Sequence, residues 1–491
     1  MVLNSKTTSL ALFAFGLASR QVMAATTCTE LITEIGAASG PTTTPIKIDA
    51  DLTCNTHIEI THSQDVTISG PYTISIAAGF TSAAGQGGSS LFVNEGTLTL
   101  EGLTFDTKAA SGNRAVWNKG TLTVTDCILD LFPGGDAEAF VDEGGAIYSD
   151  SSESVTISGS TFKSNIAKEK GGAMCVLGSE ILTVRNSGFT QSEAGQVGSS
   201  TVSIGQGGDI YAGPNVDLTV TATTFSGSSA ETGGASILCC GATIQRSNFT
   251  GAESASPERH FGAVQVGAPG DPPCSRPLTI SDSLFSGCTV GAATGEGGAL
   301  SAFDTTVTIR DSIFEGSEGT ALFFESSSAA GDYKLEMDYV QFNENSRPSD
   351  KYSSTAGSPQ GAAVVVTNTQ AGGVSSKVET GTTRNMYCFG NDPYECEFVY
   401  DGATLNHDGE FKCQLCNIDG VRQATGADDE FGGVTDRSID SGGSGSNTGI
   451  VVGLSLALGL TLVVIGALAA WKIRVRKNAR RLMEDMGEGD L

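Results

Sequence analysis

The chain has 491 residues, with 28 Lys and Arg against 55 Asp and Glu, and its formal net charge is −27 at pH 7. This charge excludes a general nucleic-acid-binding protein, because the phosphates would be repelled. Glycine accounts for 64 residues and aromatic residues for only 7%, whereas 39% of the residues are hydrophobic, too many for a disordered chain. The composition indicates many short strands joined by tight turns.

Both ends of the sequence have the character of targeting segments. Residues 1–24 combine a basic Lys6, an apolar run and small residues before Ala25, which is the pattern of a secretory signal peptide. Residues 449–471 contain no charge over 23 positions, enough for one transmembrane α-helix, and the tail 472–491 begins with a cluster of Lys and Arg. We therefore expect a type I protein of the plasma membrane or of a secretory-pathway membrane. Its N-terminus would be extracellular or lumenal and its C-terminus cytoplasmic.

The segment between these ends divides by composition into four parts. An N-terminal cap is expected over 25–60 and a series of repeats over 61–370. A cysteine-containing membrane-proximal region follows over 371–420, and a flexible linker rich in Gly, Ser and acidic residues over 421–448. This middle part is strongly acidic, and loosely bound calcium is the one cofactor that its charge suggests, although no calcium loop of the EF-hand type is present.

The central part is built on one repeat of about 30 residues. Its first element is an apolar–Thr–apolar triplet, and the copies begin at Val66, Leu98, Leu122, Val155, Leu182, Leu218, Ala242, Leu278, Val307 and, more weakly, Leu335. A large apolar residue stands seven positions after the start of nine copies, as Phe105, Leu129, Phe162, Phe189, Phe225, Phe249, Phe285, Phe314 and Phe342. A fixed offset inside a variable period predicts two short strands joined by a rigid corner, with a loop of variable length elsewhere.

Two further elements complete the repeat. Residues that tolerate a left-handed backbone stand four positions after the triplet begins, as Gly102, Asp126, Gly159, Asn186, Asp282 and Asp311, and they predict the corner. Glycine pairs precede the triplet and predict a close-packed corner leading into a third strand, at Gly144, Gly171, Gly207, Gly233 and Gly297. Three short strands per turn predict an all-β parallel solenoid with inward apolar ladders and outward Thr. Leucine-rich repeats, the structural alternative, have a shorter period and a different leucine spacing.

Two of these motifs resemble a known family. The sequence Gly-Gly-Ala-Ile at 144–147, followed by Phe162-Lys163-Ser164-Asn165, resembles the repeat pair of chlamydial polymorphic outer-membrane proteins, and Phe342-Asn343-Glu344-Asn345 repeats its second half. Residues 60–370 are similar more widely to right-handed parallel β-helix, pectin-lyase-like proteins. The resemblance implies their fold but no single function, because lyases, hydrolases, epimerases and adhesins share it. Most copies have Ser, Ala or Cys in place of the Asn.

All twelve cysteines lie between Cys28 and Cys416, in the part expected outside the membrane, and their even number predicts disulfides. The candidates are Cys28, Cys54, Cys274, Cys288, Cys388, Cys396, Cys413 and Cys416. Their pairing stays open. Zinc or redox chemistry is the alternative for Cys413-Gln-Leu-Cys416, and we favour disulfides because no His pair or second such motif lies nearby.

Candidate catalytic residues are few. Asp282 and Asp311 occupy the same register on neighbouring turns and form the best acidic pair, but their place in the corner explains them without catalysis, and we favour that explanation. The four histidines, which are His57, His62, His260 and His407, do not belong to a catalytic signature. We therefore assign no catalytic residue.

These features predict a membrane-bound β-helix protein in adhesion, recognition or carbohydrate contact. The alternative is a membrane-anchored polysaccharide lyase, hydrolase or epimerase. Aligned acids and bases on an outward face would favour the enzyme, and aromatic platforms or a Thr ladder would favour binding. The expected partners are the lipid bilayer, a polysaccharide or cell-surface protein, and a second copy that pairs through Gly449 and Gly453 in the membrane. Asn248 is the candidate glycosylation site.

Overall fold

The computed structural model describes part of the chain, which divides into two compact units, Met1–Gly433 and Val434–Leu491. The described residues all belong to the first unit, and they are 23–38, 40–81, 89–106, 113–130, 141–150, 153–178, 181–195, 205–254, 262–268, 273–290, 297–326, 333–346, 364–368, 379–383, 386–389, 396–398, 404–407, 411–413, 415–418 and 421–424. The expected transmembrane segment, 449–471, lies outside them. Among the described residues, no helix is long and apolar enough to cross a membrane.

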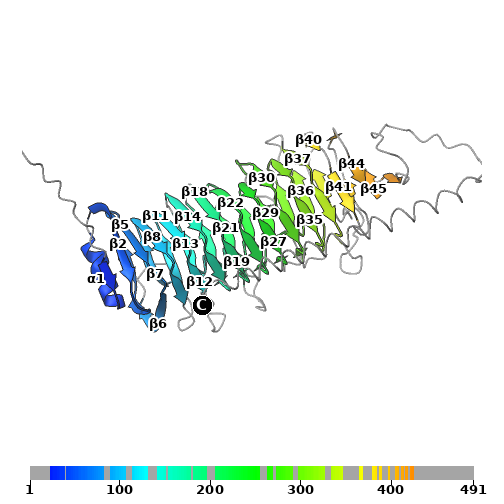
Figure 1. The fold of residues 1–491 in the computed structure, drawn as a ribbon. Helices are drawn as coiled ribbons and strands as arrows, with labels where there is room; N and C mark the ends of the chain where they lie inside the picture. The colour runs from blue at the N-terminus through cyan, green and yellow to red at the C-terminus, as the bar shows by residue number, and fades with distance from the viewer. Residues whose placement is uncertain are drawn as a thin grey trace, which may run out of the picture. The chain divides into compact units, whose positions relative to one another are not determined.

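Parallel sheets dominate the described part of the first unit (Figure 1). Sheet A, which contains the apolar–Thr–apolar triplets, comprises β1 (Met23–Ala25), β2 (Gly40–Ile48), β5 (Gln64–Ser69), β8 (Thr97–Glu101), β11 (Thr121–Thr125), β14 (Ser154–Ser158), β18 (Ile181–Arg185), β22 (Asp217–Thr221), β26 (Ala242–Gln245), β30 (Leu278–Ser281), β34 (Val307–Arg310), β37 (Lys334–Asp338), β40 (Glu379–Thr383) and β43 (Thr404–His407). Sheet B, which contains the phenylalanines, comprises β3 (Leu52–Thr56), β6 (Thr73–Thr81), β9 (Thr104–Asp106), β12 (Ile128–Asp130), β15 (Thr161–Lys163), β19 (Gly188–Thr190), β23 (Thr224–Ser226), β27 (Asn248–Thr250), β31 (Leu284–Ser286), β35 (Ile313–Glu315), β38 (Gln341–Asn343), β41 (Met386–Phe389) and β44 (Phe411–Cys413).

The glycine-pair corners lead into sheet C. It comprises β4 (Ile58–Ile60), β7 (Ser89–Asn94), β10 (Asn113–Asn118), β13 (Ile147–Ser149), β17 (Met174–Val176), β21 (Ile210–Ala212), β25 (Ile237–Cys239), β29 (Val264–Val266), β33 (Leu300–Phe303), β36 (Leu322–Ser326) and β39 (Val364–Asn368). Sheet D consists of two-residue strands, β16 (Ile166–Ala167), β20 (Glu193–Ala194), β24 (Ser229–Ala230), β28 (Glu253–Ser254) and β32 (Thr289–Val290). A separate small sheet joins β42 (Cys396–Phe398), β45 (Leu415–Ile418) and β46 (Val421–Ala424).

The chain visits the sheets in the order C, A, B and D, and each such turn forms one rung of a parallel β-helix. Every pairing within these four sheets is between parallel strands, as in Val155–Leu182 of sheet A and Phe162–Phe189 of sheet B. The predicted all-β parallel solenoid is therefore confirmed. The prediction of three strands per turn lacked the strands of sheet D, which are too short to leave a periodic pattern.

Apolar ladders fill the interior as predicted. The outer positions of the triplets are buried while the central Thr is partly exposed, and Val155, Thr156 and Ile157 are an example. On sheet B, six successive pairs of rings from Phe162 to Phe342 stack with centroids 4.7–5.1 Å apart and planes within 16° of parallel. This spacing follows the separation of neighbouring strands, about 4.8 Å, so each rung adds one ring to a continuous column.

The corner between sheets A and B has the predicted left-handed backbone. Its φ is 48–52° at Asp126, Asn186, Asp282 and Asp311, and 60–66° at the two glycines. The same conformation occurs at positions that the sequence did not single out, at Ala222, Arg246 and Tyr339, with φ of 50–54°. A column of hydroxyls fixes the corner from inside, because each side chain bonds a carbonyl two residues back and accepts an N–H from the previous rung, as Ser247 and Ser283 do.

Helix α1 (Cys28–Ala37) packs against the first strands of the solenoid (Figure 1). Thr27 caps it by accepting the N–H of Glu30, and Leu31 and Ile35 are buried. Gln64 of β5 donates its side-chain amide to the carbonyls of Ile35 and Ala38, at 2.7 and 3.1 Å. A disulfide between Cys28 and Cys54 also joins α1 to β3. The buried side chains of α1 thereby cover the apolar interior at the first rung of the solenoid.

Candidate functional site

The outward side of sheet C presents an aromatic column. Strand alternation turns Val116, Ile147, Met174 and Ile210 inward, and all four are fully buried. Their following residues face outward and lie in register on four successive rungs, in the order Trp117, Tyr148, Cys175 and Tyr211. The three rings are partly exposed and Cys175 is buried between two of them. We call this column, with the charged side chains beside it, the sheet C face.

Each ring of the column has a cation over it. The ammonium of Lys119 lies 4.4 Å from the ring centroid of Trp117, and that of Lys170 lies 5.3 Å from Tyr211. The guanidinium of Arg114 lies 4.9 Å from the centroid of Tyr148. These distances are within the range of cation–π attraction. The contacts orient the rings along the face.

Acidic side chains balance these cations. Glu143 pairs with Lys170 at 2.9 Å, and Glu95 pairs with Lys119 at 3.5 Å. Burial alone would lower the pKa of Lys170, but the hydrogen bond and charge of Glu143 outweigh burial and raise it. Burial lowers the pKa of Arg114 to about 10, although the negative side chains nearby, Glu143 among them, counteract it. Both groups therefore stay charged at neutral pH.

The hydroxyl and thiol groups of the face stay neutral. Burial and the charge of Glu143 raise the pKa of Tyr148, and the same two causes raise the pKa of Cys175 well above its ordinary value. A buried thiol with a raised pKa is a poor nucleophile, because the thiolate is the reactive form. Cys175 therefore acts in packing, and none of these groups is a base near neutral pH. The face offers aromatic rings, paired charges and a phenol that can share hydrogen bonds.

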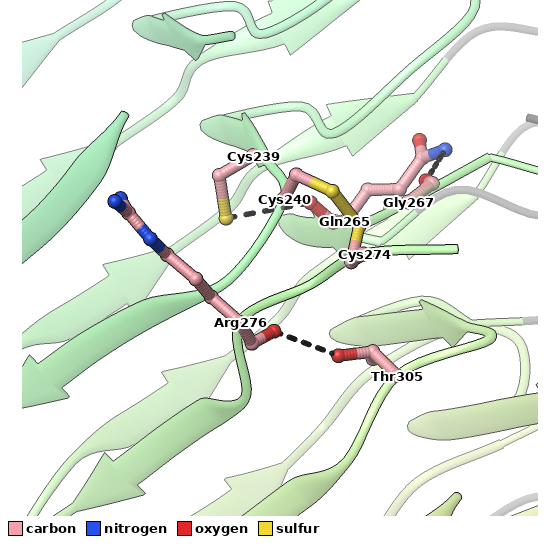
Figure 2. Close-up of a disulfide and its surroundings, with 7 residues drawn as sticks. All are labelled: Cys239, Cys240, Gln265, Gly267, Cys274, Arg276 and Thr305. Carbon is pink, nitrogen blue, oxygen red and sulfur yellow. Dashed lines mark hydrogen bonds between the residues drawn. A yellow bond between two sulfur atoms is a disulfide. The ribbon is translucent and has the colours of Figure 1, made fainter. Parts of the chain in front are cut away.

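The accessible column ends after Tyr211. The next outward residues of sheet C are buried, and they are Leu238, Gln265, Ser301 and Phe323. Figure 2 shows Gln265 beside the disulfide between Cys240 and Cys274. Its side chain accepts the N–H of Gly234 and donates to the carbonyl of Gly267, at 2.9 and 2.8 Å. These bonds satisfy the amide inside the protein and leave it unavailable to a ligand.

The structure separates the sequence-predicted acidic pair from this face. Asp282 and Asp311 are exposed at the corner between sheets A and B, where both adopt φ near 50°. Among the described residues, neither carboxylate has an ion pair or a side-chain hydrogen bond. This arrangement fits the explanation that Asp282 and Asp311 are turn residues of the corner.

Two described histidines contact acidic side chains. His57 contacts Glu59 at 3.2 Å and His62 contacts Glu95 at 3.1 Å. His260 and the side chain of His407 lie outside the described part. Trp117, Tyr148 and Tyr211 were missed by the sequence analysis, and the signal available was an aromatic residue directly after the inward residue of three sheet C strands.

The disulfides differ in part from expectation. Cys54 pairs with Cys28, but Cys274 pairs with Cys240, which was not among the candidates. Cys288 was wrongly included, because its thiol is free and lies in the buried core, two residues after the end of β31. The backbones of Cys388 and Cys413 are register partners, as are those of Cys396 and Cys416. The side chains of these four lie outside the described residues.

Comparison with protein families supports the fold. A family described as "Right handed beta helix region" matches residues 145–346. The fold and the sheet C face thus define a parallel β-helix protein with an aromatic, charge-balanced outer column. No curated protein matches the sequence at a significant level.

Solved structures are similar only distantly. The catalytic domain of a GH87 α-1,3-glucanase in complex with nigerose has a TM-score of 0.37 and 11% identity, covering 79% of this chain and 69% of that one. PfbA, a surface adhesin of Streptococcus pneumoniae, has a TM-score of 0.31 and 8% identity, covering 81% of this chain and 89% of that one. A tailspike mutant of E. coli bacteriophage HK620 has a TM-score of 0.28 and 12% identity, covering 80% and 74%. Likenesses at this level carry no functional argument.

Proposed function

We propose that the protein is a surface recognition protein whose sheet C face binds a neutral polysaccharide. The observation that supports this proposal is the register of Trp117, Tyr148 and Tyr211 on one outward column, each partly exposed and each beside a cation. Aromatic rings supply large contact area at small entropic cost. A column with one position per rung suits an extended polymer that repeats along its own axis.

Charge favours a neutral polymer over an acidic one. Lys170 and Lys119 already pair with Glu143 and Glu95, so the face has no large surplus of positive charge. The chain as a whole has a formal charge of −27, which repels polyanions. Sugar hydroxyls both donate and accept hydrogen bonds, and they can therefore bridge the paired ammonium and carboxylate groups.

The sheet C face also favours binding over the enzymatic alternative. Catalysis on a polysaccharide needs a base or acid with a pKa near the working pH. Lys170 and Tyr148 have raised pKa values and Arg114 has a pKa of about 10, so none of the three supplies such a group. The two carboxylates of the face, Glu143 and Glu95, are already engaged in ion pairs with Lys170 and Lys119.

The test is a binding and turnover screen of the full chain, purified in detergent, against neutral and acidic polysaccharides. We expect retention by at least one neutral polymer, and a loss of affinity of roughly tenfold or more in Trp117→Ala, as is typical for a central aromatic contact. Tyr339→Ala is the matched control, because Tyr339 is 53% exposed at a corner away from sheet C. Equal loss in both variants, or binding of acidic polymers alone, would contradict the proposal. Release of new chain ends would favour the lyase or hydrolase, and a changed sugar configuration in an intact polymer would favour the epimerase.

Display at a membrane is a further part of the proposal. We propose that residues 449–471 anchor the solenoid in the plasma membrane or a secretory-pathway membrane, after removal of residues 1–24, and that the anchor also pairs two copies. This removal would also take Met23 and Ala24 of β1 from the edge of sheet A. Asn248 is exposed at the start of β27, while Phe249 is buried, which suits glycosylation of Asn248. The likeness to chlamydial repeats and loosely bound calcium stay predictions, as does cell-surface protein as an alternative ligand.

A further inference from the structure

A second column of side chains accompanies the aromatic column on the sheet C face. Glu143, Lys170 and Gln206 lie in register on three successive rungs, because their backbones form parallel bridges with one another. Each stands five positions before an outward residue of sheet C, as Glu143 does before Tyr148 and Gln206 before Tyr211. We call these three residues the polar column. It follows the same rungs as the rings and runs parallel to them.

A tight corner holds the two columns together. Its first glycine has φ of 61–66° on all three rungs, at Gly144, Gly171 and Gly207. This left-handed conformation turns the chain sharply into sheet C. Lys170 bridges the columns, because its ammonium lies 5.3 Å from the ring centroid of Tyr211 and 2.9 Å from a carboxylate oxygen of Glu143. The side chains of both columns therefore reach one common strip of surface.

Both columns end on the same rung. Gly233 takes the position of Gln206 there, and the buried Leu238 takes that of Tyr211. A Cβ at Gly233 would lie 3.3 Å from Cγ of Gln206 and 2.7 Å from Cδ1 of Leu238. The missing side chain thus leaves room for the stem of Gln206, and Leu238 closes the strip beyond it. Gln206 is the last polar side chain of the strip at this end.

The amide of Gln206 differs from the nearby amide of Gln265. Gln265 is buried, and its amide is bonded to Gly234 and Gly267. Gln206 is partly exposed, and within the described part of the chain its amide forms no hydrogen bond. An amide offers an acceptor and two donors side by side, which matches two neighbouring hydroxyls of a pyranose. Gln206 is therefore available to a neutral sugar where Gln265 is not.

The spacing of the rungs favours one kind of glycosidic linkage. Neighbouring strands are about 4.8 Å apart, and a β-1,4-linked pyranose advances along its extended chain by nearly the same distance. Successive sugars of such a chain would meet successive rungs. An α-1,4-linked chain coils, so a sugar placed on Tyr211 would carry its neighbours away from Lys170 and Glu143. The face therefore discriminates by the shape of the polymer.

We infer that the polar column binds the hydroxyl edge of an extended, β-1,4-linked neutral glycan, and that Gln206 is its specificity-determining residue. This inference rests on the proposed function, because it assigns the polymer that the sheet C face would bind. Glu143 only accepts hydrogen bonds, Lys170 only donates them, and Gln206 does both. A glycan that misses the column leaves these groups without new bonds, and this difference is the source of specificity.

The test compares cellohexaose with maltohexaose, which contain the same sugar and differ only in linkage. Titration calorimetry uses the full chain in a detergent without sugar headgroups. We expect the wild type to bind cellohexaose tighter by roughly tenfold or more. Gln206→Ala should weaken cellohexaose by roughly tenfold, as expected for two lost hydrogen bonds, and maltohexaose much less. Gln245→Ala is the matched control and should keep both affinities, because Gln245 is exposed on sheet A.

A second variant separates recognition from folding. Gln206→Glu keeps the length of the side chain but lacks the two N–H donors, so the discrimination should fall while Tm stays at the wild-type value. Equal binding of the two hexaoses by the wild type, or equal loss of both in Gln206→Ala, would overturn this inference and leave the proposed function standing. A lowered Tm with unchanged discrimination would assign Gln206 a structural role instead. If the wild type binds no neutral glycan at all, the proposed function itself fails, and the assignment of the polar column fails with it.

Discussion

The inward side of sheet B and the interior beside the start of sheet C are built on different rules. On sheet B the same residue type recurs, and from Phe162 to Phe342 every ring stacks on the next. Beside sheet C the equivalent positions change from rung to rung, from Ala173 to Asp209 to Ser236. Repetition therefore stabilises the column as a whole, and local exceptions to the repeat place different side chains at single rungs. The sheet C face follows the second rule on the outside.

The largest effect is expected from interrupting the phenylalanine column. Phe225 stacks between Phe189 and Phe249 with centroids 4.9 and 4.7 Å away, and it is buried. Phe225→Ala should lower the free energy of unfolding by about 3–5 kcal/mol, through lost burial and a cavity. Urea unfolding checks the value, and hydrogen exchange of β22 and β23 locates the loss.

Phe225→Leu is the matched control for the column. Leu129 already stands in the same position on another rung, paired in register with Phe105 and Phe162. The substitution should therefore cost only about 1.5 kcal/mol or less. Equal losses for the Ala and Leu variants would contradict a column that is stabilised by filled volume, and would instead assign the effect to the aromatic stacking itself.

The next largest effect is expected from removing hydrogen bonds between buried polar side chains. Asn94 donates to the side-chain oxygen of Asn118 at 2.6 Å, and Asn118 donates in turn to Ser149 at 3.0 Å. Asn118→Ala removes these two bonds and the bond that Asn118 donates to the carbonyl of Gly120, and it leaves buried groups unpaired, so a loss of about 1–3 kcal/mol is expected in urea unfolding. Asn343→Ala, at a partly exposed position of sheet B, should change stability by less than about 0.5 kcal/mol.

A third test uses the buried free thiol of Cys288. Burial raises the pKa of Cys288 from 9.0 to about 12, whereas the thiol in the unfolded chain ionises near its ordinary value. The native state therefore holds its proton more tightly, and this contribution to stability is present below about pH 9 and is lost as the pH rises toward 12. The free energy of unfolding should fall by about 1 kcal/mol more per pH unit above pH 9 in the wild type than in Cys288→Ala. Parallel curves for the two proteins would contradict the pKa assigned to this thiol.

The predictable part of the molecule is the part that repeats. Val155, Thr156 and Ile157 alternate with period two and recur in register, so their strand and its inward face follow from pattern alone. The sheet C face contains Trp117, Tyr148, Cys175 and Tyr211, which do not repeat one residue type from rung to rung, and only stacking of rungs brings them together. The pairing of Cys240 with Cys274, which are 34 positions apart in sequence, likewise depends on a contact between neighbouring rungs.

The smallest effect concerns a corner where tertiary structure overrides local preference. Ala222 adopts φ of 50° at the position that most other rungs fill with Gly, Asn or Asp. The left-handed conformation costs a residue with a Cβ about 1–2 kcal/mol, whereas glycine pays about 0.5–1 kcal/mol through the greater freedom of the unfolded chain. Ala222→Gly should therefore stabilise the protein by up to about 1 kcal/mol, measured as a rise in the urea midpoint at unchanged slope. Ala242→Gly, in sheet A with ordinary strand backbone, has only the entropic cost and a lost buried methyl, so it should destabilise. If both variants lowered the midpoint, packing of the Ala222 methyl rather than backbone strain would dominate this corner.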